Sequence, residues 1–194
     1  MSKTLDYYDK NAASFSLSTQ NVDFTYTQDL FLSYLNDHSL LLDLGCGSGR
    51  DTKYFLNQGY CVEASDGSME MCKIASLYAG IEVKHQLFHE LDQENYYDGI
   101  WACSSILHLT KDELLVVLGK ICKALKRNGY FYTSFKYGSF EGYRKGRYFI
   151  DLTEASFLKI IEPYEFQIIQ IWVSEDVRKG REEEKWLNII LQKQ

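Results

Sequence analysis

Short apolar runs alternate with stretches of helical periodicity along most of the chain. Helices are predicted at about Arg50–Gln58, Ser68–Tyr78 and Lys111–Arg127. The apolar runs predict strands at Leu40–Leu44, Tyr60–Ser65, Glu82–Leu87, Gly99–Cys103 and Tyr130–Phe135. Strands that alternate with helices in this way form a parallel sheet covered by helices on both faces.

The helix at Lys111–Arg127 carries the clearest local signals. Thr110 and Glu113 form a T-x-x-E capping box at its start. Apolar residues then recur at helical spacing, and Gly129 is expected to end the helix.

The pattern changes toward both ends of the chain. A helix at Thr153–Ile161 precedes two predicted strands, Phe166–Val173 and Lys185–Leu191, joined by SEDVRKGREE. This connection is too short for a helical crossover, so the last two strands are predicted to be antiparallel neighbours. Residues 1–36 contain two helical stretches rich in Tyr and Phe.

The most informative segment reads LLDLGCGSGR and spans Leu41–Arg50. A buried strand leads into three glycines at alternate positions, where missing side chains allow a sharp turn and a close approach to a ligand. The helix that follows directs unpaired N–H groups and its positive dipole end at a group above the glycines. Asp66 follows Gly45 by 21 residues, where a carboxylate can accept hydrogen bonds from both hydroxyls of a ribose. We therefore expect a nucleoside-containing cofactor.

Two cofactor classes use such a loop, and the glycine spacing favours one of them. The dinucleotide fingerprint G-x-G-x-x-G/A needs a small residue at the position of Arg50, and here the third glycine comes one place early. The spacing G-x-G-x-G resembles motif I of the class I S-adenosylmethionine-dependent methyltransferases. The stretch Asp66–Met71, DGSMEM, is similar to the second signature of that family. From about Tyr8 onward the chain resembles small bacterial methyltransferases of the tellurite-resistance type, through DGIWACSSILHL, NGYFYTSFKYG, GRYFIDLTE and EDVRKGREEEKWLN.

This resemblance implies a fold and a cofactor, S-adenosylmethionine. The fold would be α/β, a single doubly wound, mostly parallel seven-stranded sheet with an antiparallel C-terminal strand pair. It would form one domain over 1–194, with 1–36 as a helical lid and 37–194 as the catalytic core. The residues implied to bind the cofactor are Asp43, Gly45, Cys46, Gly47, Gly49, Arg50, Asp66, Gly67, Ser68, Met71, Leu87, Phe88 and Cys103.

Adenine recognition departs from the family pattern. Many relatives carry an acid after the third strand, where this chain has Leu87 and Phe88. The adenine would then be held by the Phe88 backbone N–H and apolar contact, or by Glu90 or Asp92.

Methyl transfer from a sulfonium needs no metal and no covalent intermediate, so the remaining candidates are a base and acceptor-binding groups. His108 is the obvious acid–base candidate near the end of the fourth strand. The alternative is that His108 caps or packs under the helix that starts at Thr110, because a soft nucleophile needs no base.

The acceptor side is expected to use cationic and aromatic residues of the tail. Tyr8, Arg144, Arg147 and Arg181 are the candidate substrate residues, with Lys136 and Arg178 nearby in the pattern. Arginine binds oxyanions bidentately, which suggests a small anionic or polarisable acceptor. The alternative is that these charges pair with Glu175, Asp176 and Glu182–Glu184 in a solvated turn.

Charge and composition remove several function classes from consideration. Lys and Arg number 21 against 27 acids, giving a net charge of −6 without a basic block, so nucleic acid is not an expected partner. No apolar run approaches the roughly 20 residues of a membrane span, and the first residues lack a signal peptide's apolar core. Five cysteines without C-x-x-C spacing favour reduced thiols in a cytoplasmic protein and no metal site.

We therefore predict a cytoplasmic methyltransferase that acts on a small molecule. Two other functions stay open at this point: a nicotinamide-dependent oxidoreductase, and a regulatory protein that binds S-adenosylmethionine without turnover. The sequence indicates neither the methyl acceptor nor the oligomeric state.

Overall fold

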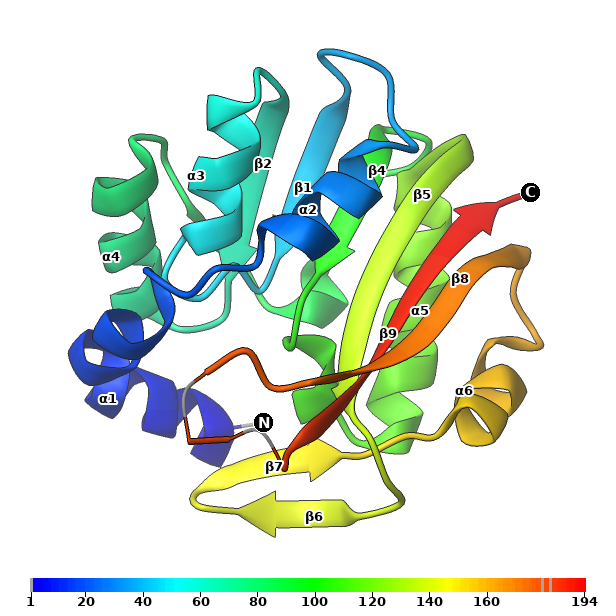
Figure 1. Ribbon diagram of the computed structural model, residues 1–194. Coiled ribbons are helices and arrows are strands. Elements are labelled where there is room, and N and C mark those ends of the chain that lie inside the picture. The colour runs from blue at the N-terminus through cyan, green and yellow to red at the C-terminus, as the bar shows by residue number, and fades with distance from the viewer. Residues whose placement is uncertain (1, 179, 182) are drawn as a thin grey trace.

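A computed structural model describes residues 2–178, 180–181 and 183–194. Its centre is a seven-stranded sheet in the order β3–β2–β1–β4–β5–β9–β8 (Figure 1). The first five strands pair in parallel, whereas β9 pairs antiparallel with both β5 and β8. The predicted fold class is thereby confirmed. The strands of this sheet are β1 (Leu40–Leu44), β2 (Cys61–Asp66), β3 (Lys84–His85), β4 (Tyr97–Ala102), β5 (Leu125–Lys136), β8 (Phe166–Glu175) and β9 (Lys185–Lys193).

Helices cover both faces of the sheet because alternate residues of each strand point to opposite sides. On one face Leu41, Trp101 and Tyr132 pack against Phe31 and Phe55, which come from two helices. The other face is covered by α5 and α6, and Figure 1 shows α5 behind the sheet and α2 in front of it. The helices are α1 (Ser2–Thr19), α2 (Thr25–Leu32), α3 (Arg50–Asn57), α4 (Met69–Ala79), α5 (Lys111–Ala124) and α6 (Glu154–Ile161), with 3-10 turns η1 (Phe88–Glu90) and η2 (Ile106–His108).

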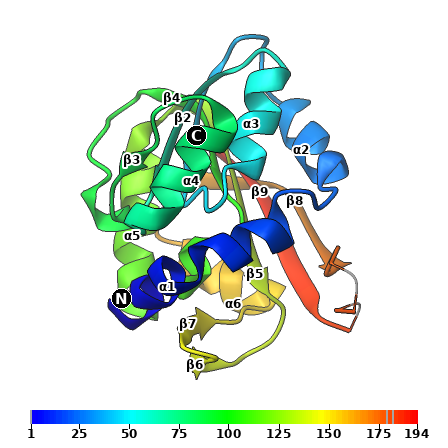
Figure 2. The same ribbon diagram turned by 90° about the vertical axis from the view of Figure 1, so that its left-hand side faces the viewer.

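The strand order places a binding crevice at one end of the sheet. From β1 the chain moves outward to β2 and β3, and it then returns to the other side of β1 as β4. Ligands of open α/β sheets bind outside the carboxyl ends of the strands at such a reversal. Helix α1 and the hairpin of β6 (Glu141–Arg144) and β7 (Arg147–Ile150) lie at this same end (Figures 1 and 2).

Two predicted boundaries are wrong for physical reasons that the structure shows. Helix α5 ends at Ala124, and Leu125, which is fully buried, already pairs with Tyr97 as the first residue of β5. Gly129 does not end the helix but lies within β5, where a Cβ would be 2.9 Å from the Lys126 carbonyl oxygen and 3.1 Å from that of Asp98. Its bare Cα lets β5 and the start of β4 approach closely.

The third predicted strand is shorter than expected. Only Lys84–His85 pairs with β2, and the chain then turns at η1. The carboxylate of Glu90 accepts a hydrogen bond from the Leu87 N–H at 2.8 Å, which closes this turn and removes Leu87 from the sheet.

The hairpin β6–β7 was not predicted. Lys145 and Gly146 form its turn with φ values of 49° and 82°, the left-handed pair that a two-residue type I′ turn requires. In the described ranges, no helix is both long enough and apolar enough to cross a membrane.

Candidate active site

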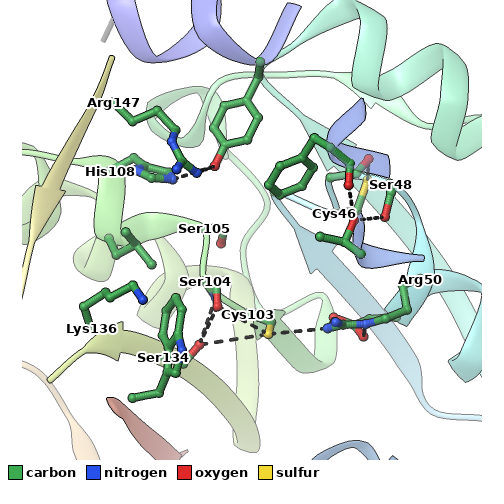
Figure 3. Close-up of a pocket in the computed structure, with 18 of the residues that line it drawn as sticks. Cys46, Ser48, Arg50, Cys103, Ser104, Ser105, His108, Ser134, Lys136 and Arg147 are labelled. Carbon is green, nitrogen blue, oxygen red and sulfur yellow. Dashed lines mark hydrogen bonds and ion pairs between the residues drawn. The ribbon is translucent and has the colours of Figure 1, made fainter. Parts of the chain in front are cut away.

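A cavity of about 210 Å³ opens at the carboxyl ends of the central strands. Its walls come from α1, the glycine loop after β1, the segments after β2 and β4, strand β7 and the β8–β9 connection. Figure 3 shows Arg147 and His108 on one side of it, and Cys46, Ser48 and Arg50 on the other. The predicted site residues that line it are Tyr8, Gly45, Cys46, Gly47, Arg50, Asp66, Gly67, Leu87, Phe88, Cys103, His108, Arg147 and Arg181.

The glycine loop is held against the ends of two neighbouring strands. The N–H groups of Gly45 and Cys46 both donate to the Ser65 carbonyl, at 2.8 and 3.0 Å. Gly45 has a φ of +78°, and a Cβ there would lie 2.5 Å from the Cβ of Ser105. Only glycine fits this position, so the backbone itself forms the cavity floor.

Asp66 connects the two predicted cofactor motifs. Its carboxylate accepts hydrogen bonds from the Gly47 N–H at 2.9 Å and the Ser68 N–H at 2.8 Å. Burial raises the pKa of this carboxyl above its usual value, and the two N–H bonds oppose that change. Each carboxylate oxygen can accept a second bond. Asp66 and the bare loop therefore fit the ribose and amino-acid portions of an adenosyl cofactor.

The opposite end of the cavity contains a buried ion pair. Arg50 donates to Asp51 from Nε at 2.7 Å and from Nη2 at 2.9 Å. Asp51 also accepts from Gln28 at 2.7 Å and from the Trp101 indole at 2.9 Å. The Arg50 guanidinium lies 4.7 Å from the Phe24 ring centre. Arg50 lines the cavity, and these contacts fix the direction of its guanidinium.

Four residues implied to bind the cofactor lie behind the cavity wall. Asp43 is 2% exposed and accepts a hydrogen bond from the Thr52 hydroxyl at 2.6 Å, so it joins β1 to α3. Ser68 caps α4, and Met71 is buried within that helix. Gly49 begins α3 in the left-handed region. The geometry does not favour direct contact between these four residues and a cofactor. They instead support the glycine loop from behind.

The structure also differs from two predictions about which residues line the cavity. Arg144 forms an ion pair with Asp151 and does not line the cavity. Glu90 is occupied by the Leu87 N–H, and neither Glu90 nor Asp92 lines the cavity. Of the residues considered for adenine binding, Leu87 and Phe88 line the cavity.

Most cations near the β8–β9 connection have carboxylate partners. Arg178 donates to Asp176 from Nε at 2.8 Å, and Arg181 lies 3.8 Å from Glu184. Lys136 pairs with Glu184 and lies over the Trp186 ring at 4.3 Å. The solvated-turn alternative thus holds for these residues, while Glu182 lies outside the described residues.

Arg147 differs from the other cations of the cavity. Among the residues described, no carboxylate forms an ion pair with it. Its Nε is buried without a hydrogen-bond partner, and Nη1 donates a long bond of 3.3 Å to the Tyr8 hydroxyl. The rings of Tyr7, Tyr8 and Phe149 surround its guanidinium at 4.6–5.7 Å.

His108 is fixed by both ring nitrogens. Nδ1 lies 2.6 Å from the Tyr148 carbonyl oxygen, and Nε2 lies 2.8 Å from the Tyr8 hydroxyl. Burial and, to a smaller extent, the Arg147 charge lower the pKa of His108 to about 4, although the hydrogen bond to the Tyr148 carbonyl acts in the opposite direction.

Some residues of the cavity had no sequence signal. Ser104 has a φ of 52°, an uncommon conformation for a residue other than glycine, and its N–H donates to the Ser134 hydroxyl at 2.9 Å. Phe15 and Phe24 line the cavity from the N-terminal segment. The sequence gives only their aromatic character, because their position depends on how α1 and α2 pack.

Residues 41–129 match the protein family described as a methyltransferase domain. This match covers the glycine loop, Asp66 and the segment after β4, and it confirms the enzyme class that the motifs predicted. No curated protein matches the sequence.

Solved structures share the fold across nearly the whole chain. One is 1,6-didemethyltoxoflavin-N1-methyltransferase from Burkholderia thailandensis, crystallised with 1,6-didemethyltoxoflavin and S-adenosylhomocysteine. It has a TM-score of 0.72 and 22% identity, with coverage of 97% of this chain and 89% of that chain. Magnesium protoporphyrin IX methyltransferase from Synechocystis, with bound S-adenosylmethionine, has a TM-score of 0.74 and 17% identity, with coverage of 97% and 94%.

The cyclase SpnF shares the same fold, with a TM-score of 0.71 and 15% identity, and coverage of 87% and 80%. Likeness at these identities establishes the fold, and the family match adds the methyltransferase class. The predicted cofactor, S-adenosylmethionine, agrees with both findings. The finer resemblance to tellurite-resistance enzymes has no support among them.

Proposed function

We propose that the protein transfers the methyl group of S-adenosylmethionine to a small acceptor that carries a negative charge. The observation that supports the anionic class is Arg147, whose cavity-lining guanidinium has no carboxylate partner in the described ranges. A cation held among aromatic rings with a buried, unpaired N–H is costly unless a ligand supplies the counter-ion. The acceptor's anionic group would supply it.

The proposed chemistry needs positioning more than reactive protein groups. A lone pair of the acceptor forms a bond to the methyl carbon while the carbon–sulfur bond breaks, and its electron pair stays on sulfur as S-adenosylhomocysteine. Asp66, the glycine loop and Arg50 would hold the cofactor, and Arg147 would hold the acceptor in line with it. Such alignment contributes about 7–11 kcal/mol to lowering the barrier.

Two of the structurally similar proteins are named for small molecules, 1,6-didemethyltoxoflavin and magnesium protoporphyrin IX. They support a small molecule as the acceptor class here. We further propose the cytoplasm as its location, since the five cysteines are free thiols in the structure.

The test compares anionic acceptors with their neutral isosteres. Purified protein is given methyl-labelled S-adenosylmethionine and a panel in which each carboxylate or phenolate is paired with its amide or methyl ether. We expect label only in the anionic members, and a loss in kcat/KM of about 10- to 100-fold in Arg147→Met, as for one lost charged hydrogen bond. Arg127→Met, which removes an exposed arginine of β5 away from the cavity, is the matched control.

Equal labelling of neutral and anionic members would refute the acceptor class. Calorimetry with S-adenosylhomocysteine, with NADH as the competing ligand, tests the cofactor separately. Binding of NADH alone would restore the oxidoreductase alternative, and binding of S-adenosylhomocysteine without labelling of any acceptor would favour the regulatory protein.

A further inference from the structure

We propose that His108 is a positioning residue: it holds the Tyr8 hydroxyl, and through it helix α1 and Arg147, in place around the acceptor. This inference rests on the proposed function, because the acceptor's site is the one that Tyr8 and Arg147 line. It gives His108 a role other than that of the base that takes a proton from the acceptor.

The hydrogen bonds of His108 define its tautomer. A backbone carbonyl can only accept, so the 2.6 Å contact to the Tyr148 oxygen places the ring proton on Nδ1. Nε2 then carries the lone pair and accepts the Tyr8 O–H at 2.8 Å. With both nitrogens engaged, His108 has no free lone pair directed at the cavity.

Tyr8 joins three separate parts of the molecule. It lies on α1, donates to His108 on η2, and accepts from Arg147 Nη1 on β7 at 3.3 Å. Its ring also contacts Phe15 edge-on, with ring centres 5.2 Å apart. Moving the Tyr8 hydroxyl would therefore remove the bond that directs Arg147.

Helix α1 is attached at both ends of the cavity, which makes it the element that His108 would hold. At one end the Tyr148 N–H donates to the Thr4 hydroxyl at 3.0 Å, beside the His108 bond. At the other end the hydroxyls of Thr19 and Ser48 are 3.0 Å apart. Figure 2 shows α1 crossing the end of the sheet.

Proton transfer within the pair is strongly unfavourable. Burial lowers the pKa of His108 to about 4 and raises the pKa of Tyr8 above its usual value, so both changes disfavour a shift of the proton from Tyr8 to His108. The charged and titratable groups that act on the pair are Arg147, Asp66, Tyr7 and Arg178. The pair thus stays neutral over the range in which a general base must titrate.

Two conservative substitutions separate positioning from base catalysis. In His108→Gln the amide oxygen can take the place of Nε2 and accept from Tyr8. In His108→Asn the amide nitrogen can replace Nδ1 and donate to the Tyr148 carbonyl, but nothing accepts from Tyr8. We expect His108→Gln to stay within about threefold of the wild type in kcat/KM, and His108→Asn to lose about tenfold, as for one hydrogen bond.

Further variants and readouts complete the test. Tyr8→Phe should lose as much kcat/KM as His108→Asn. The double variant of Tyr8→Phe and His108→Asn should lose no more than either single variant. In each case the acceptor KM should rise, and the pH profile of kcat should stay unchanged. Amide hydrogen exchange of α1 should be faster in His108→Asn and Tyr8→Phe than in His108→Gln. This exchange readout needs no turnover, so it decides the inference even if the proposed acceptor class fails.

Base catalysis predicts a different outcome. Both His108 variants would then lose about 100- to 10,000-fold in kcat, together with the acidic limb of the pH profile. Tyr8→Phe would also lose much less than either. That result, or equal exchange of α1 in all variants, would overturn the inference.

Discussion

Asp51 is the buried acid on which several elements around the cavity converge. It accepts hydrogen bonds from Arg50 on its own helix, from Gln28 on α2 and from Trp101 on β4, all at 2.7–2.9 Å. The side chain of Asp51 is 9% exposed and that of Arg50 is 19% exposed. We expect its removal to be costly, because α2, α3 and β4 share this one buried acceptor.

The substitution Asp51→Asn tests this expectation with almost no change in volume. An amide can accept on one atom only, and its NH₂ group would face donors. The Arg50 charge would lose its partner while it remains mostly buried. Breaking a buried ion pair from one side costs about 3–5 kcal/mol, and the partial exposure of Arg50 places the expected loss near the lower end of that range.

Urea unfolding measures the free energy directly. We expect Asp51→Asn to lower the free energy of unfolding by about 3 kcal/mol without a change in the denaturant slope. Glu70→Gln, which breaks the exposed pair with Lys73, is the control and should cost about 0–1 kcal/mol. If both substitutions lower the stability by the same small amount, the reasoning about Asp51 is wrong.

Three further predictions follow from the loop and its carboxylates. Gly45→Ala should lower the stability by about 1–3 kcal/mol more than Gly59→Ala, because only the Gly45 Cβ meets a neighbour, at 2.5 Å, although both have positive φ; equal losses in urea unfolding would contradict this. Asp66→Asn should weaken S-adenosylhomocysteine binding about 10- to 100-fold in calorimetry, against no change in Asp92→Asn outside the cavity. Burial raises the pKa of Asp43 to about 8, so its protonation stabilises the fold fully below about pH 4, and this stabilisation is lost as the pH rises to 8. Asp43→Asn should remove that slope, and a slope that persists in the variant would refute it.

The sheet could be predicted from the sequence because its signals are local. The run Leu40–Leu44 is apolar enough to be buried on both faces, and the T-x-x-E box at Thr110 marks a helix start that the structure reproduces. The hairpin β6–β7 was missed because neither strand alternates buried and exposed apolar positions: β6 has no buried residue, and β7 buries two adjacent ones, Phe149 and Ile150. Its turn residues, Lys145 and Gly146, were the available signal.

The cofactor side of the cavity was predictable for a similar reason. The glycine loop is contiguous, and the spacing to Asp66 follows from one strand–helix–strand unit, so both ends of the Gly47–Asp66 hydrogen bond could be named in advance. Residues such as Met71 matched the family pattern and yet lie behind the wall, because the pattern records which residues occur and not which way they face.

The acceptor side depends on contacts between distant segments, and this is why the sequence could not separate its arginines. Arg147 and Arg178 have similar surroundings in the sequence, with aromatic and acidic residues nearby. Folding gives Arg178 the carboxylate of Asp176 two residues away, whereas Arg147 receives the hydroxyl of Tyr8 from the other end of the chain. The hydrogen-bond partner determines what each arginine can bind. An arginine paired with a carboxylate is already neutralised, whereas an unpaired arginine in a cavity still attracts an anion. Under the proposed function, acceptor choice therefore depends on which cation of the described chain the fold leaves without a carboxylate.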